Sequence, residues 1–573
     1  MSEQAGVPDK DTPQVRGGFT PIASIDIEAP AWLRRISWPA VLVGLIGLLP
    51  VAASVVEVLR SPRLHFIDYW TVLSRLTNDD GTLIPRALLG YHHEHPMFVP
   101  QFLFWLDARF LGGSNHTLGL LALVLAGGLV VVLNRMLPRE LGVLTRTALT
   151  VGFVFLVFST TATELFGQGM SGISWFPVLL SSALALLCAQ RGRPWLSFGF
   201  GVLACVCHAT GFGVWPAIAL IAWLRGDKAR RVVWPLVVGA AVVAVWAVTV
   251  TRERISAGRL DADDYLATVA STVGQLWSAR VEDLAVGMGA FTAAGVLALT
   301  VALIRDRGLG RSVSPAAAGF SGLGIFVLAG AAMVAYSRTQ FGVGVGMSGR
   351  YAAFAALATA ALVVLIVLRR SRIPANTVVA GVLVLSAVTW VLGNGQAGIQ
   401  RRLYPNQEVA AVALRVNATA QLARLRVKPE VRPAALALGV YPFNSDFSLG
   451  CGAGRELGDK VDLSTVKDLA QPGDPGPNTG HVDTGPVRGD AEITGWALVR
   501  NQAPDCVLVL DQAGTVVGGG VAGLTRRDLA QQLRIDEMNA GFSAVATPGS
   551  TAPSVVVRSG GELYRVAAVA RKG

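Results

Sequence analysis

The sequence predicts a polytopic α-helical membrane protein of about 11 transmembrane helices, followed by a C-terminal extracytoplasmic domain that is mainly a β-sandwich. Hydrophobic residues make up 52% of the 573 residues and charged residues only 15%, and the mean hydropathy is +0.50. A soluble fold could not bury that much apolar surface. The net charge of +11 comes largely from arginine clusters between apolar stretches. This distribution argues against a nucleic-acid partner.

Apolar segments of about 20 residues are typical of helices that cross a hydrocarbon core of about 30 Å. The stretch 196–224 is too short for two full spans and is interrupted by His208, Gly211 and Gly213. It predicts a hairpin of short or tilted helices, whose glycines serve either a packing contact or a cavity wall. The predicted spans are 37–58, 118–137, 143–161, 175–189, the pair in 196–224, 232–250, 284–304, 316–336, 351–368 and 377–392.

The arginines predict the orientation of these spans. Arg34 and Arg35 precede the first span, so residues 1–35 are expected to form a disordered cytoplasmic tail. If the spans alternate, five arginine-rich loops should share the cytoplasmic side, and an odd number of spans leaves the C-terminus outside. These loops are 134–139, 191–193, 225–231, 305–311 and 369–372.

Polar residues return after residue 393, where the soluble part is expected to begin. The predicted domains are a transmembrane domain 36–393 with an external loop 60–113, a linker or helix 394–430, and a β-rich domain 431–573. Cys451 and Cys506 are predicted to form a disulfide, because an oxidising compartment favours one. Alternating segments 493–498, 506–510, 516–521 and 554–557 predict strands, and 525–533 predicts a helix.

The external loop contains the polar residues that most need an explanation. Asp68 lies about ten residues beyond the first span, within one of two expected helical pieces, 66–76 and 83–91. The cluster His92-His93-Glu94-His95 follows. Hydrogen bonding to a sugar or a phosphate is favoured for His93, Glu94 and His95, because adjacent histidines do not easily converge on one ion, although a divalent cation remains an alternative for the cluster.

An acidic residue just outside the first span, followed by amphipathic loop helices, resembles the GT-C superfamily of integral-membrane glycosyltransferases. Several motifs are similar to those of uncharacterised bacterial GT-C-like membrane proteins, and the resemblance covers residues 32–392. These motifs are His93-Glu94-His95 with Pro100 and the segments 102–107 and 110–113, then 166–170 before Trp175, 211–216, and Ser348-Gly349-Arg350-Tyr351.

The resemblance implies transfer of a sugar from a polyprenyl-phosphate donor to a cell-envelope glycan or lipid acceptor, outside the bacterial cytoplasmic membrane. Asp68 would be the general base, a role typically worth about 10²–10⁴ in rate. Glu164 and Gln168 are expected to line an acceptor groove. Arg350, Tyr351 and Arg338 would bind the donor phosphate, and the expected substrate-binding residues are His93, Glu94, His95, Gln168 and Trp70.

Two other functions stay open. A transporter or flippase of envelope precursors would also need broken helices, but its spans usually carry ionisable residues and internal repeats. Here the predicted spans are nearly free of charge. A non-enzymatic assembly scaffold would tolerate changes at Asp68 and His95. The sequence predicts no required metal site and no certain cofactor.

Overall fold

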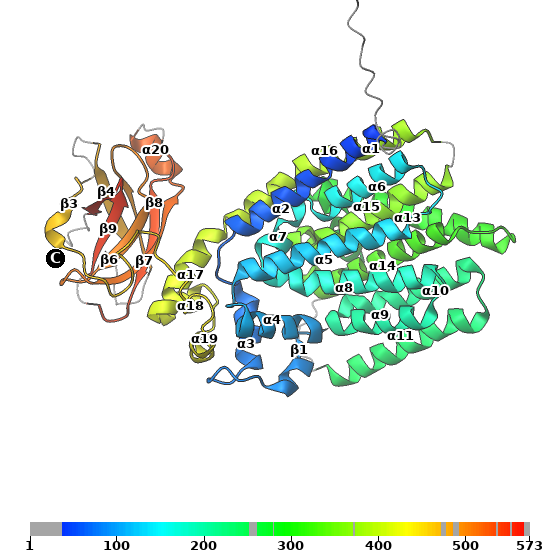
Figure 1. Cartoon of the computed structure of the whole chain (residues 1–573), viewed down its shortest axis with the longest axis horizontal. Coiled ribbons are helices and arrows are strands. Elements are labelled where there is room, and N and C mark those ends of the chain that lie inside the picture. Colours follow the sequence, from blue (N-terminus) through cyan, green and yellow to red (C-terminus); the bar gives the residue numbers. More distant parts are fainter. Residues whose placement is uncertain are drawn as a thin grey trace, which may run out of the picture.

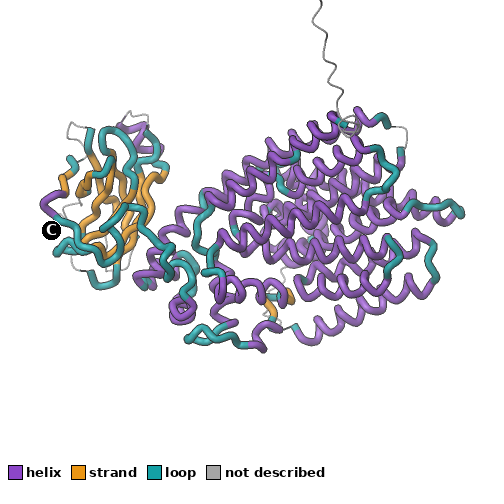
Figure 2. Tube along the Cα trace, in the orientation of Figure 1, coloured by secondary structure: helices purple, strands orange, loops and turns teal. Residues whose placement is uncertain are grey.

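The computed structural model consists of a helical bundle and a separate β-sheet domain, which short helices join (Figure 1). Apart from one short hairpin, the strands are confined to the C-terminal domain (Figure 2). The predicted cytoplasmic tail, residues 1–35, lies outside the described residues. The structure describes residues 37–250, 261–278, 280–370, 373–471, 477–484, 492–533, 537–550 and 553–566.

Within these described ranges, nine helical segments are long and apolar enough to cross a membrane. Two shorter apolar segments, Pro194–Cys207 and Ala209–Arg225, correspond to the predicted hairpin. The prediction of a multi-pass membrane protein is therefore confirmed, while the number of spans stays a prediction. The nine segments are Trp38–Arg60, Asn115–Met136, Val143–Gly167, Gly169–Gln190, Ala229–Thr249, Glu282–Gly308, Pro315–Phe341, Gly349–Arg369 and Ala375–Val416.

The bundle packs around helix α8 (Gly169–Gln190), which is buried over most of its length and contacts α5, α9, α10 and α14. Gly169 and Gly172 allow this close packing. A Cβ on Gly172 would lie 2.2 Å from the carbonyl oxygen of Leu165, and one on Gly169 would lie 2.5 Å from a backbone nitrogen of α5. Small residues at such contacts let helix backbones approach each other in membranes.

The other α-helices of this part of the chain precede the strands of the β-sheet domain. They are α1 Trp38–Ile46, α2 Leu48–Arg60, α3 Ile67–Leu76, α4 Phe98–Phe110, α5 Asn115–Met136, α6 Val143–Val157, α7 Thr163–Gly167, α9 Pro194–Cys207, α10 Val214–Arg225, α11 Ala229–Thr249, α12 Ala262–Gly274, α13 Glu282–Gly308, α14 Pro315–Arg338, α15 Ala352–Arg369, α16 Ala375–Arg401, α17 Tyr404–Val416, α18 Thr419–Arg424 and α19 Arg432–Leu438.

The arginine-rich loops gather at one end of the bundle, opposite α3, α4 and the β-sheet domain (Figure 1). Arg191 donates a hydrogen bond to the carbonyl oxygen of Arg135 at 3.2 Å, and Arg369 pairs with Asp306. Each of these contacts joins two of the loops, and Figure 1 places the loops at the same end of the bundle, as alternating spans require. The assignment of that side to the cytoplasm stays a prediction.

The loop region 60–113 folds into a small layer at the other end. Helix α3 confirms the first predicted helical piece, whereas the second is a 3-10 helix, Pro85–Leu89, followed by a strand. Strands β1 (Tyr91–His92) and β2 (His95–Pro96) form a hairpin whose tip is His93 and Glu94. His93 has a φ of 52°, a left-handed conformation that short hairpin turns require.

The C-terminal domain is one eight-stranded sheet with the order β3-β10-β9-β6-β7-β8-β5-β4. Its edges meet where Ala470, just beyond β3, forms a parallel bridge to Thr479 in β4. The sheet therefore curls on itself, rather than forming the two separate sheets of the predicted sandwich. The strands are β3 Val466–Asp468, β4 Thr479–Thr484, β5 Ile493–Leu498, β6 Cys506–Leu510, β7 Val516–Leu524, β8 Gly541–Ala546, β9 Ser554–Ser559 and β10 Glu562–Arg565, with helix α20 at Arg527–Leu533.

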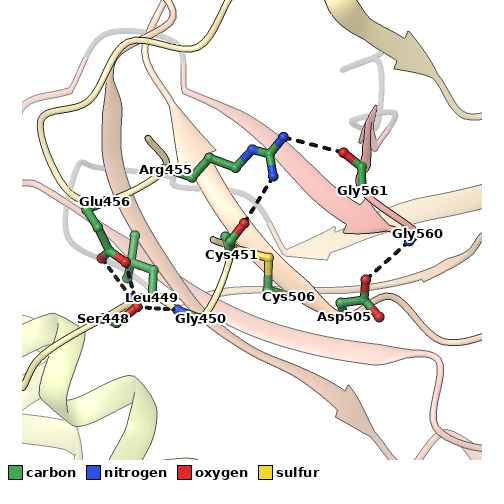
Figure 3. The surroundings of a disulfide bond; sticks show 10 residues. All are labelled: Ser448, Leu449, Gly450, Cys451, Arg455, Glu456, Asp505, Cys506, Gly560 and Gly561. Carbon is green, nitrogen blue, oxygen red and sulfur yellow. Dashed lines mark hydrogen bonds between the residues drawn. A yellow bond between two sulfur atoms is a disulfide. The ribbon is translucent and has the colours of Figure 1, made fainter. Parts of the chain in front are cut away.

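Cys451 and Cys506 form the predicted disulfide, with Cα atoms 5.6 Å apart (Figure 3). The bond ties the loop before β3 to strand β6. Arg455 supports this loop by donating to the carbonyl oxygens of Cys451 and Gly561, at 3.2 and 3.4 Å (Figure 3). The other three cysteines, Cys188, Cys205 and Cys207, are buried and are not disulfide-bonded.

The two parts are joined by helices rather than by a loop. Helix α16 continues through the expected domain boundary at residue 393, and α17 packs on strands β7 and β8. Near this junction Glu57 of α2 accepts hydrogen bonds from Arg401, at 2.5 Å, and from the Tyr404 hydroxyl, at 2.7 Å. This contact fixes the first span against the segment that leads into the β-sheet domain.

Candidate functional site

A cavity of about 180 Å³ lies where the loop region 60–113 meets the ends of α8, α14 and α15. It brings together six residues that the sequence analysis proposed for a site. These are Asp68, His93, His95, Arg338, Arg350 and Tyr351. The other residues that line it are His92, Met97, Met170, Ser171, Ser174, Trp175, His208, Ala209, Thr210, Met333, Val334 and Ser337.

Asp68 is the half-exposed carboxylate of the cavity, with 44% of its side chain accessible. It is the second residue of helix α3, where the helix dipole favours a negative charge. Its Oδ2 atom lies 4.0 Å from Nε2 of His92. The Asp68 carboxylate thus lies near His92 and keeps exposed surface that a ligand can contact.

His92 is buried between α3 and the cavity. Arg75 donates hydrogen bonds to Nδ1 of His92, at 3.1 Å, and to the carbonyl oxygen of Tyr91, at 2.8 Å. Burial lowers the pKa of His92 to about 4, and the charge of Arg75 acts in the same direction, while Asp68 opposes both. His92 is therefore neutral at neutral pH.

The hairpin tip places Glu94 behind the cavity wall, between His95 and Arg338. Oε1 of Glu94 lies 3.2 Å from Nε2 of His95 and 3.9 Å from the Arg338 guanidinium. Burial would raise the pKa of Glu94, but contact with His95 and the charge of Arg338 lower it to about 2. Glu94 supports two residues of the cavity and is not itself among its lining residues.

Arg350 is held by a buried carboxylate, Glu164. The backbone N–H of Arg350 and the hydroxyl of Ser348 donate to Oε2 of Glu164, at 3.1 and 3.2 Å. Nε of Arg350 lies 3.3 Å from Oε1, and 46% of the arginine side chain is exposed. Glu164 was expected to line an acceptor groove. Instead it positions the loop that carries Arg350.

An aromatic wall forms one side of the cavity. His95 stacks on His208, with ring centroids 4.0 Å apart, and the ring of Trp175 lies 4.3 Å from His208 and 5.5 Å from Tyr351. His208 therefore belongs to a cavity wall. Gly211 serves a packing contact, which is the other role that the sequence left open. A Cβ there would lie 2.4 Å from the carbonyl oxygen of Ala204.

Besides Glu94, two further predicted substrate-binding residues lie outside the cavity lining. Trp70 is fully buried, and its indole N–H donates to the carbonyl oxygen of His65 at 2.9 Å. Gln168 donates to Oε1 of Gln400 at 3.1 Å. Each side chain therefore contacts protein groups instead of the cavity. The local sequence does not identify these contacts.

A second cluster of ionisable groups lies on the buried side of α3, here called the side beneath α3. All of its side chains are fully buried. Nε2 of His65 is 3.0 Å from Oδ2 of Asp107, and the Tyr69 hydroxyl donates to the same oxygen at 3.3 Å. Burial, followed by the charge of Asp107, raises the pKa of Tyr69 well above its usual value. This cluster connects α3 to α4 and has no access to solvent.

The divalent cation that the sequence left open finds no ligand set in the described ranges. They contain no group of three or more His, Cys, Asp or Glu side chains arranged to hold a metal ion.

No protein-family model, no curated protein and no solved structure matches this chain. The function is therefore argued from the residues of the cavity and their chemistry.

Proposed function

We propose that the protein is a GT-C-type integral-membrane glycosyltransferase. It would transfer a sugar from a polyprenyl-phosphate donor to a cell-envelope glycan or lipid acceptor, on the outer side of the cytoplasmic membrane. One observation carries the proposal. A single cavity at the end of the helix bundle combines the half-exposed carboxylate of Asp68, the guanidinium groups of Arg338 and Arg350, and an aromatic wall.

Asp68 suits the role of general base. A sugar hydroxyl is a poor nucleophile at neutral pH, so a carboxylate that accepts its proton in the transition state lowers the barrier. In the proposed step the acceptor oxygen bonds to the anomeric carbon while the bond from that carbon to the phosphate oxygen breaks. The hydroxyl proton passes to Asp68, and the bonding electrons leave with the phosphate.

Arg338 and Arg350 suit the leaving phosphate. Each guanidinium lies beside a carboxylate, Glu94 or Glu164, and keeps part of its side chain exposed, 29% and 46% respectively. The carboxylates hold the two arginines in place before the ligand arrives. Preorganised cations of this kind stabilise negative charge that develops on an oxygen in the transition state.

The aromatic wall suits the transferred sugar. Trp175 and Tyr351 meet edge to face, and His208 lies against Trp175. Such rings offer flat apolar surface beside polar atoms, which matches the C–H face and the hydroxyl groups of a sugar ring. The sugar would then lie between the wall and Asp68.

The test uses the full chain in native membranes with farnesyl phosphate esters of mannose, glucose, galactose and arabinofuranose as donors. Release of farnesyl phosphate and incorporation of labelled sugar into membrane glycan are both measured. We expect Asp68→Asn to lower the rate on the donor that the wild type uses by about 10²–10⁴. Asp79→Asn, an exposed aspartate of the same loop region, is the matched control and should keep the wild-type rate. Wild-type transfer by Asp68→Asn would refute the assigned base.

A further inference from the structure

We infer that Arg75 and His92 form a positioning relay for Asp68, in which Arg75 selects the tautomer of His92 that directs an N–H group at the Asp68 carboxylate. The inference rests on the proposed function, because it assigns Asp68 a task that orientation would improve. Neither Arg75 nor His92 is assigned contact with the reacting atoms. Both are positioning residues.

The hydrogen bond from Arg75 determines the tautomer. A guanidinium has only donors, so the ring nitrogen that it contacts must be the acceptor. That nitrogen is Nδ1 of His92, 3.1 Å from Arg75. The proton of the neutral ring must then sit on Nε2, which is the atom 4.0 Å from Oδ2 of Asp68. A separation of this length is common between catalytic groups before a substrate binds.

The fold makes this arrangement stable. Asp68 and Arg75 are seven residues apart on helix α3, so they lie two turns apart on the same face. The ring of His92 bridges them from strand β1. The second hydrogen bond of Arg75, to the carbonyl oxygen of Tyr91, ties its guanidinium to the backbone of that strand. The relay therefore links the helix that carries Asp68 to the hairpin that forms the cavity wall.

The relay fits the proposed chemistry because His92 is a neutral donor. A neutral N–H group can orient the carboxylate without neutralising its negative charge. Asp68 therefore stays able to accept the proton of the acceptor hydroxyl. One oxygen of Asp68 then faces His92, and the other stays open to the acceptor. The charged and titratable groups around the relay are Asp68 and Arg75 on α3, His93 and His95 on the hairpin, and His208, Arg338 and Arg350 across the cavity.

The first test does not depend on activity. The full chain, labelled with ¹⁵N-histidine in lipid nanodiscs, is studied by NMR, and the His92 signal is assigned by its loss in His92→Gln. We expect the Nε2–H tautomer at pH 7. Arg75→Gln should raise the titration midpoint of His92, and Asp68→Asn should lower it, because those two groups act on the ring with opposite sign. If Arg75→Gln leaves the tautomer unchanged and Asp68→Asn leaves the midpoint unchanged, the relay does not exist.

The second test measures turnover with the farnesyl phosphate sugars. His92→Phe should lower kcat about tenfold with little change in KM, since it removes the N–H group that faces the base. His92→Gln, whose amide N–H can replace Nε2–H, should stay within about threefold of the wild type. Arg86→Gln, an exposed arginine of the same loop region, is the control for Arg75→Gln and should keep the wild-type rate.

The two tests separate the relay from the proposed function. If the NMR coupling is present but the wild type consumes none of the donors, the relay stands and the glycosyltransferase assignment falls. If a donor is consumed and His92→Phe turns over like the wild type, the relay is overturned while the proposed function stands.

Discussion

Helix α3 separates two clusters of ionisable groups that differ in their access to solvent. Beneath it, His65, Tyr69 and Asp107 are fully buried and bonded to one another. Above it, Asp68 is 44% exposed, and its contact with His92 is 4.0 Å long. An aspartate and a histidine are thus present on both sides of the helix, in opposite environments.

The difference separates a structural role from a chemical one. A buried hydrogen-bonded cluster resists change, because removing one member leaves its polar partners in the protein interior without compensation. A half-exposed carboxylate can exchange its neighbours for a ligand at little cost. We therefore expect changes beneath α3 to affect folding and changes above it to affect activity.

The largest expected effect is on the buried side. Asp107→Ala removes the acceptor shared by His65 and Tyr69 and should destabilise the protein by about 1–3 kcal/mol for each of these two buried groups. Thermal unfolding of the detergent-solubilised full chain measures this loss, and Asp68→Asn is the matched change on the exposed side, expected within about 0.5 kcal/mol of the wild type. Equal stability of the two variants would erase the proposed distinction.

The next effect concerns pH and comes from the cavity side. The pKa of His92 is lowered to about 4 from 6.5. Between these values the unfolded chain binds a proton that the folded chain does not, so stability falls as the pH falls from 6.5 to 4. The shift corresponds to roughly 3 kcal/mol.

Unfolding temperatures at pH 7.5, 6, 5 and 4.5 would measure this effect. His92→Gln removes the titrating ring and should lose less stability than the wild type across that range. Parallel curves for the two proteins would show that His92 does not contribute. Glu94, whose pKa is lowered to about 2, adds a loss in the same direction only at lower pH, as its folded pKa is approached.

The sequence predicts the parts of this structure that depend on local pattern. The spans follow from length and hydropathy. The predicted strands 493–498 and 506–510 coincide with β5 and β6, because alternating apolar residues and glycine turns define them locally. The curled sheet could not be predicted in this way. Strand β5 pairs with β8, about 50 residues later, and such pairing depends on tertiary packing.

The cavity shows the same limit. Asp68 and His95 could be proposed from their place in the external loop after the first span. Arg338 and Arg350 could be proposed because a charged residue at the end of a span is costly and needs a reason. Trp175 sits inside an apolar helix, and its sequence resembles that of any core tryptophan. Arg75 could be linked to His92 only once the hairpin was placed against α3. What the sequence lacks is the contact between these elements.

A moderate effect is expected at Arg350. Arg350→Gln should raise the KM for the farnesyl phosphate sugar by about tenfold or more, since a hydrogen bond to a charged group is worth about 1.5–3 kcal/mol. Stability should change less, because Glu164 still accepts from Ser348 and from the backbone N–H of residue 350. Arg109→Gln, an exposed arginine of α4, is the control. An unchanged KM in Arg350→Gln would remove this residue from the phosphate site.

The smallest effect returns to the buried side and tests whether the two clusters are independent. Tyr69→Phe removes one hydrogen bond, 3.3 Å long, but keeps the ring that stacks on His65 at 3.6 Å. Since Asp107 still bonds to His65, the expected loss is about 0.5–1.5 kcal/mol, with turnover unchanged. If turnover falls while stability holds, the cluster beneath α3 takes part in setting the position of Asp68, and the two sides of the helix form one system.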